Sequence, residues 1–326
     1  GILGNPYPNS HWLVNCYPTP PMKVVFIVNN KNKRAVRVLP ELERCCRQTS
    51  PGPVQFLLTR RKKHAIELAR QAAENGCDCI IAVGGDGTLH EVINGLLQSS
   101  LPAGKYPAIG LLPCGSANDF ARTAHISDSV EDLLNLIQTH TTQKIDLGQI
   151  LLKQTGEVRY FINIAGAGLG GEVVQKMEQS SGLLGPGLNY FWHIFAGFLR
   201  YIKKEVTCTG GGWKWQGPLL QMAVANGRCF GNALCVAPDA RLDDGLFQIA
   251  IFGDLSVWDY LKNLGKLKKG VRIDHPEVTY HKAKEILLES KSPLHIEADG
   301  ESVGLAPATL RVLPKALVFL MPPGTL

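Results

Sequence analysis

A glycine-rich turn between an apolar run and a helix constrains this chain more than any other feature. The run Cys79–Val83 contains no charged residue, which is typical of a short buried strand. From Thr88 onward apolar residues recur at the spacing of one helix face, namely Leu89, Val92, Ile93 and Leu96. A strand that passes directly into a helix in this way predicts a unit of a parallel α/β sheet.

The turn itself is Gly84-Gly85-Asp86-Gly87-Thr88, and it predicts a phosphate site. Glycines at a strand-to-helix turn expose backbone N–H groups at the positive end of the helix. The carboxylate of Asp86 would repel a phosphate, so it indicates a divalent cation or a proton acceptor. We expect Thr88 to cap the helix, with Glu91 completing a capping box. An ordinary tight turn would explain the glycines but not the acid between them.

A second element of the same kind follows the apolar run Ala108–Leu112. It reads Pro113-Cys114-Gly115-Ser116-Ala117-Asn118-Asp119-Phe120-Ala121-Arg122. Around these motifs the first part of the chain alternates further predicted strands and helices. The strands are Val24–Val28 and Val54–Leu58, and the helices are Lys33–Arg47, Thr59–Asn75 (capped by Thr59) and Val130–Thr139.

This alternation predicts a parallel sheet covered by helices, with ligands at the carboxyl ends of its strands. Thr59, Asp86 and Ser116 each follow such an end and should lie on one edge of the sheet. From about Lys144 the pattern changes to short strands separated by Gly and Pro turns, which predicts a β-rich second domain. Two of its predicted strands are Thr309–Leu313 and Leu317–Met321, and a helix is expected over Leu188–Lys204.

The first motif resembles the GGDGT signature shared by diacylglycerol kinases, sphingosine kinases, NAD kinases and phosphofructokinases. The second resembles the P-x-G-T-x-N-D-F-A-R element of the diacylglycerol kinase catalytic family, with Ser116 where threonine is usual. The resemblance covers nearly all of Met22 to Pro323. It implies an α/β nucleotide-binding domain at 22–143 and a β-sandwich at 144–314, with the active site in the cleft between them. The last strand, at about 315–326, would return to the first domain.

The resemblance also implies a set of nucleotide contacts. They are Asn29, Thr59, Gly84, Gly85, Asp86, Gly87, Thr88, Glu91, Gly115, Ser116 and Asn118. From physical reasoning alone, Thr59 is equally well explained as a helix cap. The loop after Asn29 departs from the family pattern, because it lacks the usual proline and glycine.

Two turns of the second domain resemble family elements that carry acidic groups. In the first, Asp244 would give a carboxylate, and Arg241 and Leu246 would give backbone carbonyls, to a Mg²⁺ ion. In the second, Glu301 would be the general base on the acceptor hydroxyl, and Asp299 would be a supporting or metal-facing group. Each turn is also compatible with an ordinary Asp-Gly hairpin.

Composition narrows the class of partner and the compartment. The net charge of +6 suits ATP or an anionic membrane surface, and no nucleic-acid-binding motif accompanies it. No apolar stretch reaches the length of about 20 residues that a spanning helix needs. Nine cysteines, an odd number without metal-type spacing, favour a reducing cytoplasm over a disulfide framework. Residues 1–21 read as an extension, either artificial or native, before a natural start at Met22.

The sequence therefore predicts an ATP- and Mg²⁺-dependent kinase that phosphorylates a lipid hydroxyl during transient contact with a membrane. Diacylglycerol, phosphatidylglycerol, monoacylglycerol and sphingoid bases all remain open as acceptors, and a homodimer is open as well. Two alternatives stay in view: an NAD kinase, and a protein that binds lipid or nucleotide without turnover. The basic stretch Lys262–Arg272 would suit anionic headgroups or a solvated helix end.

Overall fold

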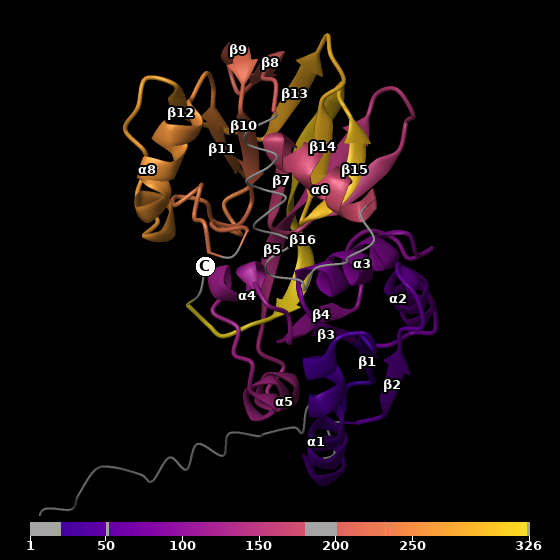
Figure 1. Ribbon diagram of the computed structural model, residues 1–326. Helices are drawn as coiled ribbons and strands as arrows, with labels where there is room; N and C mark the ends of the chain where they lie inside the picture. Colours follow the sequence, from indigo (N-terminus) through magenta and orange to yellow (C-terminus); the bar gives the residue numbers. More distant parts are fainter. Residues whose placement is uncertain (1–20, 50–51, 180–200, 232, 325–326) are drawn as a thin grey trace, which may run out of the picture.

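The computed structural model describes residues 21–49, 52–179, 201–231 and 233–324 (Figure 1). Residues 1–20 and the aromatic segment 188–199 lie outside these ranges, and so does most of the helix expected over Leu188–Lys204. No helix within the described ranges has both the length and the apolar character needed to cross a bilayer.

The first part of the chain alternates strands and helices. Its elements are β1 (Val24–Val28), α1 (Lys33–Thr49), β2 (Val54–Leu58), α2 (His64–Glu74), β3 (Cys79–Gly84), α3 (Asp86–Leu97), β4 (Ala108–Pro113), α4 (Asp119–Thr123) and α5 (Val130–Gln138). The remainder is mostly strand. Its elements are β5 (Thr142–Leu152), β6 (Val158–Phe161), β7 (Ile164–Gly168), α6 (Leu169–Gln179), β8 (Lys204–Gly210), β9 (Trp213–Leu219), β10 (Gln221–Ala225), β11 (Phe247–Phe252), α8 (Val257–Lys268), β12 (Val278–Ala283), β13 (Glu285–Ser290), β14 (His295–Ala298), β15 (Glu301–Leu305) and β16 (Ala308–Leu320).

The strands β2, β1, β3 and β4 form a parallel sheet that has helices on both faces (Figure 1). Every residue of β1 and β3 is buried, because both faces of these strands are covered. One face packs against apolar residues of α2 and α3, and the other against those of α1 and α5. The predicted parallel, helix-covered sheet is therefore confirmed.

The long strand β16 joins this parallel sheet to the second half of the molecule (Figure 1). Its C-terminal end pairs in parallel with β4 at Phe319 and Ile109. Over its length it also pairs antiparallel with β5, and its N-terminal part pairs with β13. The result is one mixed, ten-stranded sheet that runs from β2 at one edge to β9 at the other.

A second sheet of six antiparallel strands faces the far part of the first sheet. Its strand order is β12-β11-β10-β7-β14-β15. Between the two sheets lies an apolar core that includes Phe161 stacked on Phe247, with ring centroids 5.5 Å apart. An α/β domain followed by a β-sandwich is the fold class that the sequence predicts.

Three local expectations were wrong. The two strands expected near the C-terminus are one strand, β16, with an irregularity between Leu313 and Leu317 where Lys315 takes a left-handed conformation. Lys204, expected to end a helix, begins β8. Cys229 and Cys235 form a disulfide, although the cysteine count favoured reduced thiols. A backbone bridge between Phe230 and Leu234 brings these two cysteines together.

The contact of Phe319 with Phe120 provides a test of the joint between the two parts. Phe319 is fully buried, and the ring centroids are 5.2 Å apart. We expect Phe319→Ala to lower the free energy of unfolding by about 3–5 kcal/mol, because it leaves a cavity in the core. Urea denaturation measures this loss, with exposed Val36→Ala as the control that changes stability by less than about 0.5 kcal/mol. A small effect of Phe319→Ala would contradict the role of this contact.

Candidate active site

The predicted phosphate turn connects β3 directly to α3, and Gly85 is the N-cap residue. A Cβ atom on Gly84 would lie 2.3 Å from Thr88 Oγ1, so no larger residue fits there. The N-cap residue is a glycine and has no side chain to cap the helix, and the first N–H groups of α3 lie at its positive end, which favours an anion. The expectation that Thr88 is the cap was wrong. Thr88 lies inside the first turn, and its hydroxyl accepts a hydrogen bond of 3.0 Å from Asn29 Nδ2.

Asp86 links this turn to the second motif. Its two carboxylate oxygens accept hydrogen bonds of 3.1 Å from the backbone N–H groups of Asp119 and Phe120, at the start of α4. Burial raises the pKa of Asp86, while the two N–H donors oppose this rise. The carboxylate thus fixes the second loop against the first, and it does so at the edge where a phosphate would bind.

The loop after β4 is closed by Asn118, which adopts a left-handed conformation (φ 51°). Its side-chain amide bonds both the N–H and the carbonyl of Gly115, at 2.9 and 3.0 Å. A Cβ atom on Gly115 would lie 2.7 Å from the Cα atom of Gly85, so the two turns are in direct contact. Ser116 is exposed at the tip of this loop.

Thr59 and Glu91 do not have the helix-capping roles that the sequence suggested. Helix α2 begins at His64 rather than after Thr59, and buried Thr59 accepts a hydrogen bond from Asn30 N instead. Glu91 does not close a capping box on its own helix. Its carboxylate accepts hydrogen bonds from Lys63 N and Ala65 N, at 3.0 and 3.2 Å. The cap of α2 therefore comes from α3, because Lys63 has no side-chain hydrogen bond that could supply it.

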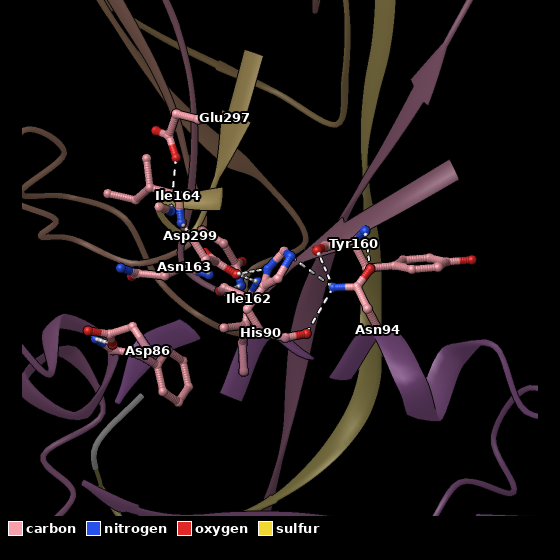
Figure 2. Close-up of polar contacts among 12 residues, drawn as sticks. Asp86, His90, Asn94, Tyr160, Ile162, Asn163, Ile164, Glu297 and Asp299 are labelled. Atoms are coloured by element: carbon pink, nitrogen blue, oxygen red, sulfur yellow. Dashed lines mark hydrogen bonds and ion pairs between the residues drawn. The ribbon is translucent and has the colours of Figure 1, made fainter. Parts of the chain in front are cut away.

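Asp299 lies in the turn between β14 and β15, with its side chain 3% exposed. Its carboxylate accepts hydrogen bonds from the backbone N–H groups of Ile162, Asn163 and Ile164, at 2.9, 3.0 and 3.1 Å (Figure 2). His90 of α3 contacts the same carboxylate at 3.3 Å. Since both oxygens already accept these donors, the structure favours the supporting role for Asp299 over a metal-facing one.

Glu301 begins β15, two residues after Asp299, and its side chain is 25% exposed. Its Oε1 atom lies 3.6 Å from the point that a Cβ atom on Gly87 would occupy. Its Oε2 atom lies 3.5 Å from Nζ of Lys62. The predicted base of the second domain therefore reaches the first turn of α3, where the predicted nucleotide turn lies.

The predicted metal turn holds several carboxylates in a small volume. Asp244 accepts a hydrogen bond of 3.1 Å from Leu246 N, and its other oxygen lies 3.7 Å from Nζ of Lys282. Arg241 lies 3.4 Å from Asp243. Buried Asp146 accepts hydrogen bonds from Gly245 N and Lys315 N. Burial is the largest cause that raises the pKa of Asp146, and the charges of Asp244 and Asp243 add to it.

Hard oxygen donors of this kind would fit a divalent cation held by one carboxylate, backbone carbonyls and water, although Lys282 and Arg241 already lie beside Asp244 and Asp243. The described residues contain no group of three His, Cys, Asp or Glu side chains placed to bind a metal. Within the described residues, this turn therefore does not provide a metal site made of side chains alone.

Two family models together match most of the chain. Residues 23–150 match the diacylglycerol kinase catalytic domain, and residues 163–321 match the YegS C-terminal NAD kinase beta sandwich-like domain. The chain belongs to the diacylglycerol kinase catalytic-domain family.

Named relatives agree with this family, and a solved structure shows the same fold. A diacylglycerol kinase of Staphylococcus haemolyticus (strain JCSC1435) is 29% identical over 87% of this chain and 82% of its own length. A diacylglycerol kinase of Staphylococcus aureus (strain bovine RF122 / ET3-1) is 29% identical over 78% of each chain. The crystal structure of a diacylglycerol kinase from Bacillus anthracis str. Sterne has the same fold, with a TM-score of 0.70 and 20% identity over 94% of this chain and 100% of its own.

Four residues of this family member were missed in the sequence. Asp146 stands between Ile145 and Leu147, and a lone acid inside an apolar strand is a usable signal of a buried carboxylate. His90 gave no signal, because only the tertiary fold brings it to Asp299, 209 residues away. Glu297 bonds Gly300 N within its own turn, and its burial, which the sequence did not indicate, makes it distinctive. Lys62 was missed because it belongs to the basic run Arg60–Lys63, and such runs at the start of a helix usually face solvent.

The buried carboxyl of Glu297 predicts a pH-dependent stability. Burial raises its pKa from 4.5 to about 8, and the hydrogen bond from Gly300 N only partly opposes this. The unfolded chain releases the proton near pH 4.5 but the folded chain keeps it to about pH 8. The folded state is therefore disfavoured progressively as the pH rises between these values. At about 1.4 kcal/mol per pKa unit, the full cost is on the order of 5 kcal/mol above pH 8.

Glu297→Gln keeps an oxygen for Gly300 N and removes the ionisation. We expect this variant to be a few kcal/mol more stable than the parent protein at pH 8 and equally stable near pH 4.5. Urea denaturation at a series of pH values measures the difference. Parallel stability curves for the two proteins across this range would show that Glu297 is not the group responsible.

Proposed function

We propose that this protein transfers the γ-phosphate of ATP to the hydroxyl group of a lipid, with Mg²⁺ as the cofactor. The observation that carries the proposal is the position of the Glu301 carboxylate beside Gly87 of the α3 turn. At this point the proposed nucleotide-binding turn of the first domain lies beside a carboxylate of the second domain that could accept a proton. Membership of the diacylglycerol kinase catalytic-domain family supports the reaction class.

The nucleotide would bind at the two contacting turns. The N–H groups at the start of α3 face the phosphates, and the glycines let the backbone approach them closely. Asn29, through its hydrogen bond to Thr88, holds the end of β1 against this turn. Asp86 keeps the loop of Gly115 and Ser116 in register with it, through its bonds to α4.

Glu301 would act as the general base on the acceptor. A primary hydroxyl is a weak nucleophile at neutral pH, so its proton must move to a base as its oxygen attacks the γ-phosphorus. The proton passes to the Glu301 carboxylate, the new P–O bond forms, and the bond to ADP breaks. Lys62, 3.5 Å from Glu301, places a positive charge beside the carboxylate and near the transferred phosphoryl group.

For the metal, the turn at Asp244 is the binding site that we favour. The Asp244 carboxylate and the backbone carbonyls of Arg241 and Leu246 would hold Mg²⁺, with Asp146 supplying further negative charge from β5. A bound divalent cation would neutralise the charges of Asp244 and Asp146 and would order this turn. NAD kinase activity is the second candidate, favoured by the match of residues 163–321 to an NAD kinase beta sandwich-like domain.

Phosphate transfer from labelled ATP in mixed micelles tests the proposed reaction. The acceptors are diacylglycerol, phosphatidylglycerol, monoacylglycerol and a sphingoid base, each with and without Mg²⁺, with NAD as a further acceptor. A labelled lipid that requires Mg²⁺ is the expected result. Labelled NAD, or no labelled product at all, would contradict it.

Glu301→Gln tests the base. We expect kcat to fall by a factor of about 10²–10⁴ while the KM for ATP stays close to that of the parent, since the amide cannot accept the proton. Glu285→Gln is the matched control, because Glu285 is exposed on β13. Turnover of Glu301→Gln near the parental rate would rule out Glu301 as the base.

We infer that α8 supplies the contact with the membrane. Trp258, Lys262, Lys266 and Lys269 are all exposed and recur at helical spacing, so they form one solvent-facing stripe. Trp258 is 73% exposed, which is unusual for such a large apolar side chain. A basic helix face with an exposed tryptophan suits the surface of an anionic bilayer.

Replacing Lys262, Lys266 and Lys269 together with Gln tests this surface. Each lysine near an anionic surface contributes about 1 kcal/mol, so binding to phosphatidylglycerol vesicles should weaken roughly a hundredfold. The control carries Gln at three exposed lysines elsewhere, Lys105, Lys153 and Lys284. Co-sedimentation measures both proteins. Equal weakening in the two would mean that general charge, rather than α8, is responsible.

A further inference from the structure

The side-chain amide of Asn94 has a fixed orientation. Its Oδ1 atom accepts a hydrogen bond of 3.1 Å from Tyr160 N, and its Nδ2 atom donates one of 3.0 Å to Tyr160 O (Figure 2). Rotating the amide by 180° would place its NH₂ group against Tyr160 N–H and its oxygen against Tyr160 O, so that both hydrogen bonds would be lost. The backbone of β6 therefore determines which end of the Asn94 side chain faces the neighbouring helix turn.

This orientation determines where His90 carries its proton. Nδ2 of Asn94 lies 3.3 Å from Nε2 of the His90 ring. The two hydrogens of Nδ2 already go to Tyr160 O and His90 O, each at 3.0 Å, and an amide NH₂ group cannot accept a hydrogen bond. A proton on Nε2 would therefore have no acceptor at this contact. The proton of the neutral imidazole is then on Nδ1, which lies 3.3 Å from Oδ2 of Asp299 and donates to it.

The recipient, Asp299, is already committed to the second domain. Its carboxylate accepts the three backbone N–H groups of residues 162–164, and it lies in a turn that holds it at a φ of 51°. The other carboxylates that face it are Glu297 of β14 and Asp86 of α3. His90 thus gives α3 of the first domain a direct contact with the turn that precedes Glu301.

We propose that His90 is a positioning residue, which in its Nδ1–H form holds Asp299 and so sets Glu301 against the α3 turn. This inference rests on the proposed function. His90 is one helix turn from Asp86, and Asp299 is two residues from Glu301. This hydrogen bond therefore connects the nucleotide side of the site to the base side, in addition to the ion pair of Lys62 with Glu301.

The nucleotide side does not depend on this bond. Asp86 is held by Asp119 and Phe120, and Thr88 by Asn29, all within the first domain. Loss of His90 should therefore disturb the placement of the base and leave ATP binding intact. In kinetic terms, kcat falls and the KM for ATP does not change.

Two substitutions at the same position separate this role from simple packing. His90→Phe keeps the ring but removes both polar atoms, and we expect kcat to fall roughly 10- to 100-fold with the KM for ATP within twofold. His90→Gln offers one donor for Asp299 and one acceptor for Asn94, and we expect it to keep kcat within about fivefold of the parent. His281→Phe is the matched control, since His281 stacks on Trp213 and contacts Thr279 in the second domain.

If His90→Phe does not fold, the inference is still tested by the kcat of His90→Gln and by the tautomer of the His90 imidazole in the parent protein. Nitrogen-15 NMR of labelled protein at pH 7 reports the tautomer, with the His90 signals identified by their loss in His90→Gln. Protonation at Nδ1 alone is the expected result. A proton on Nε2 would overturn the inference. Equal kcat values for His90→Phe and the parent would also overturn it, and so would a tenfold loss of kcat in folded His90→Gln.

These outcomes are distinct from a failure of the proposed function. A parent protein that phosphorylates none of the lipids contradicts the proposed reaction and with it the kinetic role of His90. The NMR result still tests the hydrogen-bond network by itself. A parent that phosphorylates lipid, and a His90→Phe variant that does so equally well, contradicts the role of His90 alone.

Discussion

The backbone pairing of β16 is the interaction on which the rest of the molecule depends. This one strand pairs with β5 along its length, with β13 near its start and with β4 at its end. The parallel sheet and one of the two sheets of the sandwich are therefore two regions of one continuous ten-stranded sheet. Their relative position is set by hydrogen bonds of the main chain, which have little freedom to vary, rather than by a linker.

Within this framework, the site is assembled by carboxylates that bind the backbone N–H groups of a different loop. Asp86 holds the start of α4, Glu91 the start of α2, Asp146 the metal turn, and Asp299 the loop between β6 and β7. Glu301 differs from these four, because its carboxylate is partly exposed and lies beside Lys62. Most of the acids at the site therefore hold a neighbouring loop in place, and Glu301 is the one that the proposed function assigns to the reaction.

Sequence alone was sufficient for the elements whose pattern is local. The buried strands, the glycine turn and the carboxyl-end edge all follow from apolar periodicity and glycine spacing around Asp86. Where the prediction failed, a distant group had replaced a local one. Thr59 and Thr88 look like helix caps, yet Glu91 supplies the cap of α2 from a neighbouring helix, and Asn29 binds Thr88. The spacing of residues cannot show that a distant side chain takes the place of a local cap, because the partner lies far away along the chain.

The contact between Gly85 and Gly115 has a consequence for how this site can vary. A Cβ atom on Gly85 would lie 3.0 Å from the Cα atom of Gly115, and one on Gly115 would lie 2.7 Å from the Cα atom of Gly85. Each glycine meets the other's main chain, which cannot be trimmed to make room. A change at one position therefore has no compensating change at the other. Any sequence drawn by selection for this fold would be expected to keep glycine at both positions, however far the rest of the chain diverges.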